Sequence, residues 1–273
     1  MSLSYSNAVS VSRAERARLL EFALATVAEA GQAVLPYFRN DPATSNKAAP
    51  GHFDPVTEAD EAAERLIRSR IQEAWPAHGI FGEEEGHVDG NGLTWVIDPI
   101  DGTRAFLTGM LHWGMLLALF DGETPVLGLM HQPFTNEFFY GDNDEAWYRR
   151  GDVKQQLQVR PCASLSHAML ATTSPELFDP GHERDAFQQL WDRARLTRFG
   201  GDCYLYALLA MGQLDLVVES NLKPFDIQAL VPIVRGAGGL LTTWQGDDPS
   251  LGGRIVAAGD ARLHAEVCRI LAE

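Results

Sequence analysis

Apolar residues recur at helical spacing over the first third of the chain. A capping box, Ser12-x-x-Glu15, predicts the start of a first helix, and a second helix is expected from near Thr57 to about Trp75. The segment 41–53 between them is expected to be a loop. The apolar face of the first helix consists of Leu20, Leu24, Val27, Val34 and Phe38, and that of the second of Ala63, Leu66, Ile67, Ile71 and Ala74.

The pattern then changes to short apolar segments separated by turn residues. Segments 80–81 and 95–97 are expected to be buried strands. Further along, segments joined by Asp-Gly and Asp-Asn turns are typical of an antiparallel meander. The strands of this meander are predicted at 113–120, 125–132, 136–140 and 145–148.

The rest of the chain alternates between strand and helix patterns, a βαβ-like rhythm. Strands are expected at 168–172, 196–199, 214–219, 240–244 and 255–258, and helices at 183–194, 204–211, 226–236 and 261–271. The prediction is a layered α/β protein in a single domain. Its approximate halves, 1–158 and 159–273, are expected to share one interface.

Composition narrows the functional classes. The chain has 273 residues and a formal net charge of −15, which argues against nucleic acid as a bulk partner. Its three cysteines are far apart and never form a Cys-x-x-Cys pair, so we expect free thiols and a reducing compartment. We expect no membrane span and no signal peptide, which makes a cytoplasmic location the prediction.

The most informative segment is Trp95-Val96-Ile97-Asp98-Pro99-Ile100-Asp101-Gly102-Thr103. A buried strand ends in two carboxylates three residues apart, with a proline that stiffens the link between them. Two such acids beside exposed amides suit a hard cation and a phosphate group. The alternative is a strand followed by an ordinary acidic turn.

Other acids also lie at the ends of predicted elements. They are Asp54 and Asp60 at the start of the second helix, Glu83 and Glu84 after segment 80–81, and Asp226 as the first residue of the helix at 226–236. Each has a structural alternative: a capping box for Asp60, an N-cap for Asp226, and a solvated turn for Glu83 to Glu85. Together, carboxylates at one edge of a sheet would repel one another unless divalent cations bound there, and all-oxygen ligands favour Mg²⁺.

These residues resemble the inositol monophosphatase superfamily of Mg²⁺-dependent, lithium-sensitive phosphatases over residues 12–271. The matching motifs are Asp54-x-Val56-Thr57-x-x-Asp60, Gly82-Glu83-Glu84, Asp98-Pro99-Ile100-Asp101-Gly102-Thr103 and the helix that follows Lys223-Pro224-Phe225. The resemblance implies an αβαβα sandwich, two or three Mg²⁺ ions, a homodimer and direct in-line attack by water.

The resemblance also assigns roles to individual residues. It implies that metal is held by Glu83, Asp98, the Ile100 carbonyl, Asp101 and Asp226. Thr103 and Glu83 would position the attacking water, Glu84 and Asp54 would orient Thr103 and metal-bound waters, and Lys47 would balance charge. Independently of the resemblance, the amides of Gly102 and Thr103 would hold phosphate oxygens if these residues begin a helix.

Some residues depart from the inositol pattern and favour another branch of the superfamily. Arg104 follows the Asp-Gly-Thr motif, and Lys223-Pro224-Phe225 precedes Asp226. The segment Phe199-Gly200-Gly201-Asp202-Cys203-Tyr204 contains two candidate substrate-binding residues, Gly201 and Asp202. These features look like histidinol-phosphate phosphatases, where Asp202 and Glu219 would face the ammonium or imidazole of the substrate. Arg104, next to the motif, would contact the phosphate or the product. The alternatives are an N-cap role for Asp202 and a surface role for Arg104.

The predicted function is therefore hydrolysis of a small phosphate monoester, with L-histidinol phosphate favoured and inositol monophosphate second. Histidine biosynthesis would follow only from the first substrate. A nucleotide bisphosphatase and a non-catalytic metal-binding relative are less favoured. A haloacid dehalogenase phosphatase is disfavoured. In that family the two aspartates are two residues apart near the start of the chain, whereas Asp98 and Asp101 are three residues apart in mid-chain.

Overall fold

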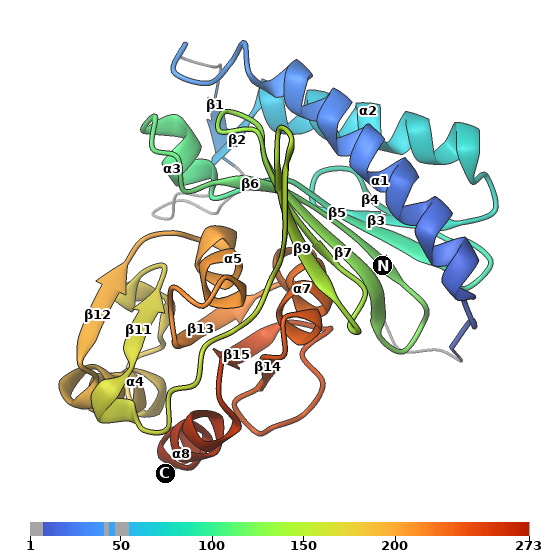
Figure 1. Cartoon of the computed structure of the whole chain (residues 1–273). Helices are drawn as coiled ribbons and strands as arrows, with labels where there is room; N and C mark the ends of the chain where they lie inside the picture. Colours follow the sequence, from blue (N-terminus) through green and yellow to red (C-terminus); the bar gives the residue numbers. More distant parts are fainter. Residues whose placement is uncertain (1–7, 41–43, 47–54, 273) are drawn as a thin grey trace.

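Five alternating layers of helices and sheets form the protein. In the computed structural model, residues 8–40, 44–46 and 55–272 are described (Figure 1). Helices α1 and α2 cover one face of an eight-stranded sheet, helices α5, α6 and α7 lie between that sheet and a five-stranded sheet, and α4 and α8 form the outer layer. This is the layered α/β protein that the sequence pattern predicts, in the αβαβα arrangement that the family resemblance implies.

The first layer begins where its capping residues predict. Helix α1 (Arg13–Val34) has Ser12 as its N-cap, whose hydroxyl accepts a hydrogen bond from the Glu15 amide over 3.3 Å. Helix α2 (Glu58–Ala74) starts with a complete capping box between Thr57 and Asp60. The segment between these helices contains strand β1 (Thr44–Asn46), which pairs antiparallel with β2 (Pro55–Thr57), so the expected loop at 41–53 includes a short strand.

The eight-stranded sheet contains the predicted meander. Its strand order is β10-β9-β8-β7-β6-β5-β3-β4, with only the β3–β5 pair parallel among the described strands. The short β4 and the fully exposed β10 carry no apolar alternation, so they were not expected from the sequence. The strands are β3 (Gly79–Gly82), β4 (Gly86–Val88), β5 (Thr94–Asp101), β6 (Gly114–Phe120), β7 (Pro125–Gln132), β8 (Glu137–Gly141), β9 (Ala146–Arg150) and β10 (Val153–Gln156).

The middle layer contains the main difference from the expected helices. The single helix expected at 226–236 is two helices, α6 (Pro224–Ile227) and α7 (Leu230–Gly236), while α5 (Cys203–Ala210) is close to its expected position. Pro232 has no backbone N–H and cannot donate to the Gln228 carbonyl, so the helical ladder is interrupted at this point. Asp226 is therefore held on a short helix of its own.

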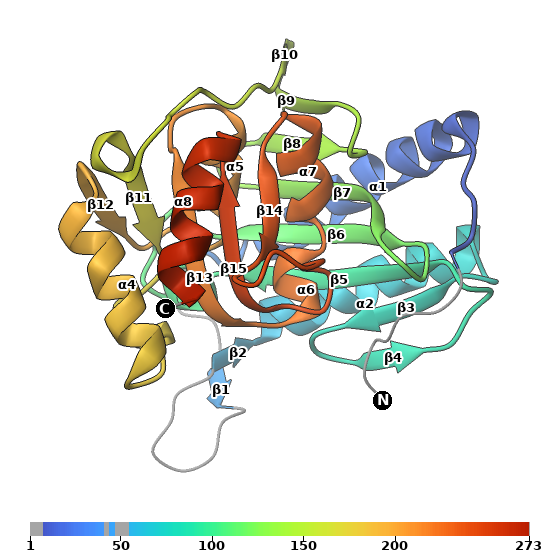
Figure 2. The same ribbon diagram turned by 90° about the horizontal axis from the view of Figure 1, so that it is seen from below.

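The second sheet has the order β12-β11-β13-β15-β14. Strand β11 is parallel to β12 and β13, as a βαβ rhythm predicts, but β15 runs antiparallel to both β13 and β14. Helix α8 packs on β15, and α4 packs on α8 (Figure 2). The elements are β11 (Met169–Thr172), β12 (Leu196–Phe199), β13 (Leu216–Leu222), β14 (Leu240–Thr243), β15 (Gly253–Ala258), α4 (His182–Arg193) and α8 (Ala261–Ala272), with 3-10 turns at Leu165–His167 and Pro175–Leu177.

One hydrophobic cluster crosses from the first sheet to the second. It includes Val96 and Leu116 from the first half of the chain and Ala171, Val217 and Ile255 from the second. The three cysteines are free thiols, as predicted. No helix among the described residues is long and apolar enough to cross a membrane.

Candidate active site

The site begins at the end of strand β5, where the ladder with β6 becomes irregular. Asp98 pairs with Leu116 and Asp101 with Gly114, so the register shifts between the two acids. The Asp98 carboxylate accepts a hydrogen bond from the Ile100 amide over 3.1 Å, which holds the bulge closed. Both carboxylates therefore leave the strand in fixed positions.

A left-handed glycine turns the chain from β5 into helix α3 (Thr103–Leu107). Gly102 has φ of +86°, and a Cβ at this position would lie 2.7 Å from the His112 carbonyl oxygen. Only glycine fits here without strain. The turn places the Thr103 hydroxyl 3.1 Å from the Ile100 carbonyl oxygen, to which it donates. The predicted water-positioning threonine and the predicted carbonyl ligand are thus in contact.

Asp226 reaches the same place from the second half of the chain. It is the third residue of α6, and one of its carboxylate oxygens accepts a hydrogen bond from the Lys223 amide over 2.6 Å. One carboxylate oxygen from each of Asp98, Asp101 and Asp226 can be chosen so that all lie within 4.8 Å of one another. Asp226 therefore caps its helix and also joins the acidic cluster.

Burial and mutual repulsion shape the charges of this cluster. Burial raises the pKa of Asp98 well above its usual range, and Glu83, Asp101 and Asp226 add to the effect. Burial, reinforced by Asp226, raises the pKa of Asp101 to about 8, and burial also raises that of Asp226 to about 8. Carboxylates that destabilise one another in this way form a site that a divalent cation would stabilise.

Glu83 and Glu84 follow strand β3 in the turn between β3 and β4. The Glu83 amide continues the β3–β5 ladder by donating to the Ile97 carbonyl over 3.2 Å. The Glu83 carboxylate raises the pKa of both Asp98 and Asp226, so it acts on the same cluster. The alternative of a merely solvated turn fits Glu85, which is exposed, better than Glu83 and Glu84, which are partly buried.

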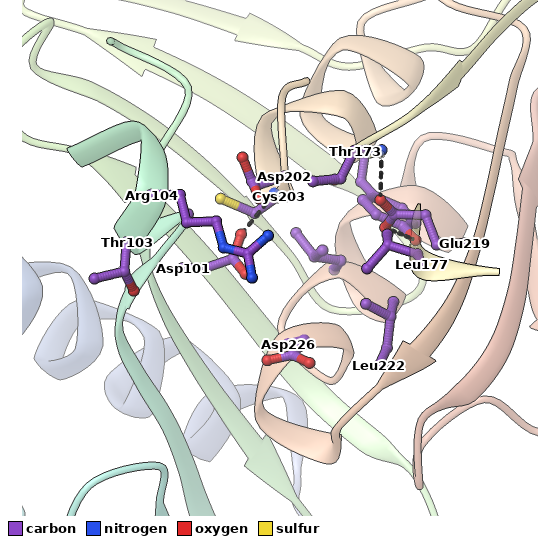
Figure 3. A pocket seen from close by; sticks show the side chains of 13 residues that line it. Asp101, Thr103, Arg104, Thr173, Leu177, Asp202, Cys203, Glu219, Leu222 and Asp226 are labelled. Carbon is purple, nitrogen blue, oxygen red and sulfur yellow. Dashed lines mark hydrogen bonds between the residues drawn. The ribbon is translucent and has the colours of Figure 1, made fainter. Parts of the chain in front are cut away.

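Next to the carboxylates lies a cavity of about 270 Å³ (Figure 3). Asp101, Gly102, Thr103 and Arg104 line it from β5 and α3, and Asp226 lines it from α6. The remaining lining residues are Thr173, Leu177, Asp202, Cys203, Tyr206, Glu219, Leu222 and Leu230. The acidic cluster, the start of helix α3 and the cavity thus adjoin one another.

The two acids predicted to contact the substrate both line this cavity. Asp202 is the N-cap residue of α5 by position, yet its side chain makes no capping hydrogen bond. Burial, together with Asp101 and Glu219, raises the pKa of Asp202 to about 8, while the Gly201 backbone and Arg104 act in the opposite direction. Gly201 itself is not among the lining residues. Its backbone forms a hydrogen bond with Asp202 that lowers the pKa of that carboxyl.

Glu219 is held by partners that the sequence did not indicate. One carboxylate oxygen accepts from the Thr173 amide over 3.0 Å and the other from the Tyr206 hydroxyl over 2.8 Å. Glu219 is buried, and burial raises its pKa. Arg104 is exposed and extends from α3 beside the cavity (Figure 3).

Two predicted site residues, Lys47 and Asp54, lie outside the described residues. The neighbouring Asp60 is buried, and one of its carboxylate oxygens accepts from both the amide and the hydroxyl of Thr57, over 2.8 and 2.5 Å. The capping-box interpretation of Asp60 is therefore confirmed.

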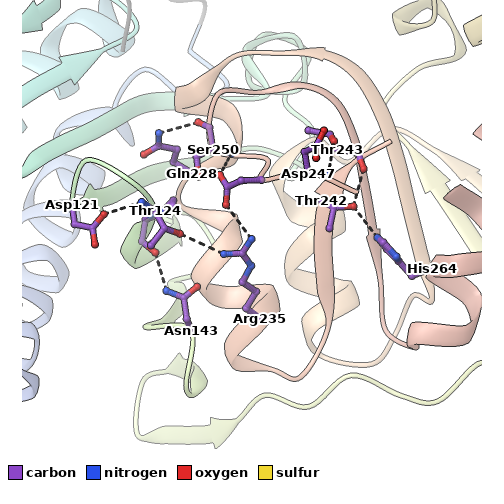
Figure 4. A network of polar contacts seen from close by, with 12 residues as sticks. Asp121, Thr124, Asn143, Gln228, Arg235, Thr242, Thr243, Asp247, Ser250 and His264 are labelled. Atoms are coloured by element: carbon purple, nitrogen blue, oxygen red, sulfur yellow. Dashed lines mark hydrogen bonds and ion pairs between the residues drawn. The ribbon is translucent and has the colours of Figure 1, made fainter. Parts of the chain in front are cut away.

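A polar network anchors the two short helices α6 and α7 (Figure 4). The Gln228 amide group, just after α6, donates to the Ser250 carbonyl over 2.9 Å. Arg235, near the end of α7, contacts the Thr124 hydroxyl over 3.4 Å in the turn between β6 and β7. These contacts fix the helices that carry and follow Asp226 against both sheets.

This arrangement of strand-end carboxylates, helix-start amides and an adjoining pocket defines a phosphomonoesterase. The chain belongs to the inositol monophosphatase family, whose model matches residues 15–273. It is 39% identical over 253 residues to the bifunctional phosphatase IMPL2, chloroplastic, of Arabidopsis thaliana (88% of this chain, 71% of that protein). It is 35% identical over 246 residues to the histidinol-phosphatase of Chlorobaculum parvum (89% and 92%).

A solved structure shares the fold. An inositol monophosphatase from Zymomonas mobilis superposes with a TM-score of 0.84 at 37% identity, over 96% of this chain and 100% of that one. The family uses divalent metals, and the acidic cluster of this chain fits such ions because its donors are all carboxylate oxygens that repel one another. Relatives named for different substrates are about equally similar to this chain, so the substrate has to be inferred from the pocket.

Proposed function

We propose that this protein is a Mg²⁺-dependent phosphomonoesterase that hydrolyses L-histidinol phosphate. The observation that carries the choice of substrate is the acidic wall of the cavity formed by Asp202 and Glu219. An amino alcohol phosphate brings a cation to this wall, whereas a polyol phosphate brings only hydroxyl groups. A cation would favour the charged carboxylates, whose pKa values burial raises.

The proposed chemistry assigns one role to each group of residues. Asp98, Asp101, Asp226, Glu83 and the Ile100 carbonyl would hold the metal. Bound divalent cations would lower the pKa of water and neutralise charge on the phosphate.

The chain's own residues supply the remaining steps. The Thr103 hydroxyl, with Glu83, would orient the attacking water in line with the leaving oxygen. Gly102 and Thr103 would present backbone amides to the phosphate oxygens, and Arg104 would contact the phosphate or the product.

Inositol monophosphate is the second candidate, supported by a specific observation. Glu219 is fixed by Thr173 and Tyr206, so its carboxylate is a rigid acceptor that a sugar-like hydroxyl could also use. A nucleotide bisphosphate is less suited, because the base and second phosphate favour cationic and aromatic surroundings. The described lining includes one cation, Arg104, and one aromatic ring, Tyr206, but its further acids Asp202 and Glu219 would repel a second phosphate.

The deciding experiment compares kcat/KM for phosphate release from L-histidinol phosphate and inositol-1-phosphate with Mg²⁺ present. We expect the first substrate to be favoured by tenfold or more, about 1.4 kcal/mol. The variants Asp202→Asn and Glu219→Gln should reduce this preference. Glu176→Gln is the matched control, because Glu176 is exposed and stands next to Leu177 of the cavity without being part of the described lining.

Two outcomes would contradict parts of the proposal. A clear preference for inositol-1-phosphate would overturn the substrate and leave the phosphatase chemistry in place. Turnover that persists after complete removal of divalent metal would overturn the metal-dependent mechanism. Calorimetric titration with Mg²⁺ would count the ions, for which we propose two or three, and light scattering would test the proposed homodimer. Inhibition of turnover by lithium is proposed on the same basis.

A further inference from the structure

A buried ion pair on helix α2 contacts the turn that carries two of the proposed site residues. Glu64 is fully buried and Arg68 is 5% exposed, and the Arg68 Nε lies 2.8 Å from a Glu64 carboxylate oxygen. Burying two charges costs free energy unless each is hydrogen-bonded further. Here the further partners are backbone groups of the turn between β3 and β4.

The contacts are made at consecutive residues of that turn. The two Glu64 carboxylate oxygens accept hydrogen bonds from the amides of Glu84 and Glu85, over 2.8 and 2.9 Å. Arg68 donates from Nη2 to the Gly86 carbonyl oxygen. The pair therefore satisfies two donors and one acceptor of the turn, all immediately after Glu83.

The sequence of the turn is adapted to this contact. A Cβ on Gly82 would lie 2.0 Å from a Glu64 carboxylate oxygen, closer than any real contact. Gly82 is thus required because the Glu64 side chain occupies the space beside it. On the other side of the strand end, the Glu83 amide is fixed to Ile97 over 3.2 Å. The Glu83 backbone is held from both sides.

We propose that Glu64 and Arg68 are positioning residues that hold this turn so that Glu83 and Glu84 face the metal site. The inference rests on the proposed metal-dependent function. Because the pair is neutral as a unit, it fixes the turn without adding net charge to a cluster of acids that already repel one another. Groups that orient metal ligands from behind commonly change metal affinity by 10- to 100-fold when they are altered.

The test uses Glu64→Gln and Arg68→Lys, with Glu61→Gln as the matched control. Glu61 and Arg65 form the same i,i+4 pair on the same helix over 3.2 Å, but both side chains are about half exposed. Mg²⁺ affinity is measured by calorimetry on metal-free protein. Amide hydrogen exchange at Glu84 and Glu85 reports on the turn independently of metal. We expect roughly tenfold weaker Mg²⁺ binding and faster exchange in the two test variants, and neither change in the control.

The outcomes separate this inference from the proposed function. If the unmodified protein binds no Mg²⁺, the proposed function fails; if it binds Mg²⁺ and both test variants bind equally well, only the positioning role fails. If Glu64→Gln does not fold, Arg68→Lys and the double variant Glu64→Leu/Arg68→Met decide, because apolar replacement of a buried pair often preserves stability. A folded double variant with unchanged Mg²⁺ affinity would overturn the inference.

Discussion

The amide of Cys203 donates a hydrogen bond to a carboxylate oxygen of Asp101 over 2.6 Å. Asp101 ends strand β5, whereas Cys203 begins helix α5, so a proposed metal ligand from the first half is fixed by the second half. This bond lowers the pKa of Asp101 and partly opposes the effect of burial. Folding of the two halves and assembly of the site are therefore coupled.

This coupling predicts how pH changes the stability of the metal-free protein. Asp101 and Asp226 have pKa values of about 8 when folded, against 3.8 as the reference value, so the native state holds protons that the unfolded state has lost. The free energy of unfolding therefore falls as pH rises from the reference pKa of 3.8 to the folded pKa of about 8. The window from about pH 6.5 to 8.5 isolates the effect, because buried histidines with lowered pKa, such as His131, respond mainly below it.

The measurement is the melting temperature in chelator and in Mg²⁺ across that window. We expect it to fall with pH in chelator and to fall less, or not at all, in Mg²⁺, because the ion binds the deprotonated carboxylates. Asp101→Asn should weaken both the slope and the effect of Mg²⁺. A metal-free melting temperature that rises between these pH values would contradict the prediction.

Replacing Thr103 by alanine should remove activity while leaving the fold intact. Its hydroxyl contacts the Ile100 carbonyl over 3.1 Å, at the start of the helix that faces the cavity. Loss of a group that positions the attacking water should cost about 10²-fold or more in kcat. Thr108→Ala is the control, because its hydroxyl donates to the Arg104 carbonyl over 2.9 Å at the other end of the same helix. Equal losses in both variants would show that only helix stability matters.

Gly102→Ala should damage the site through the backbone. The added methyl group would lie 2.7 Å from the His112 carbonyl oxygen at a φ of +86°. A strained residue of this kind costs about 1–3 kcal/mol, and relief of the strain would shift α3. We expect a lower melting temperature together with reduced kcat. The control is Gly151→Ala, also at positive φ but in open space, which should lower stability without changing kcat.

Much of the fold can be predicted from the sequence, because most helices and strands carry their apolar residues on one face. Helices α1 and α2 start directly after their N-cap residues, Ser12 and Thr57, and each carries an apolar stripe. The same logic fails for α6 and α7, where one apolar run covers two helices separated at Gln228. It also fails for β10, whose residues are all exposed and therefore show no alternation.

The site divides in a similar way. Asp98 and Asp101 are recognisable from the sequence because the strand, proline and glycine that fix them are adjacent to them. The hydrogen bond from the Cys203 amide to Asp101 cannot be predicted from the sequence, since nearly every residue has a backbone N–H. The sequence gives only a weak indication that Glu64 and Arg68 are buried. Together with Asp60 they place a charged residue at every fourth position along the buried face of α2. Only the fold shows that the turn after β3 lies against them.

An ion pair between the buried Asp215 and the partly exposed Arg160 should contribute to stability without affecting catalysis. Asp215 is 1% exposed and accepts hydrogen bonds from Arg160 over 2.6 and 2.7 Å and from the Met169 amide over 2.7 Å. It precedes β13, at the end of the strand away from Glu219 and the cavity. Its contacts join the segment before β11 to the centre of the second sheet.

Asp215→Ala leaves the Met169 amide and a partly exposed guanidinium without their acceptor, so we expect a loss of about 2–4 kcal/mol in the free energy of unfolding. Glu29→Ala is the comparison, because Glu29 and Arg70 form a solvent-exposed pair over 2.7 Å, and exposed pairs contribute little to stability. Chemical denaturation gives both values, and kcat of the folded fraction should match the unmodified protein. A loss for Asp215→Ala no larger than that for Glu29→Ala would mean that Arg160 and Met169 find other partners, including water, at little cost.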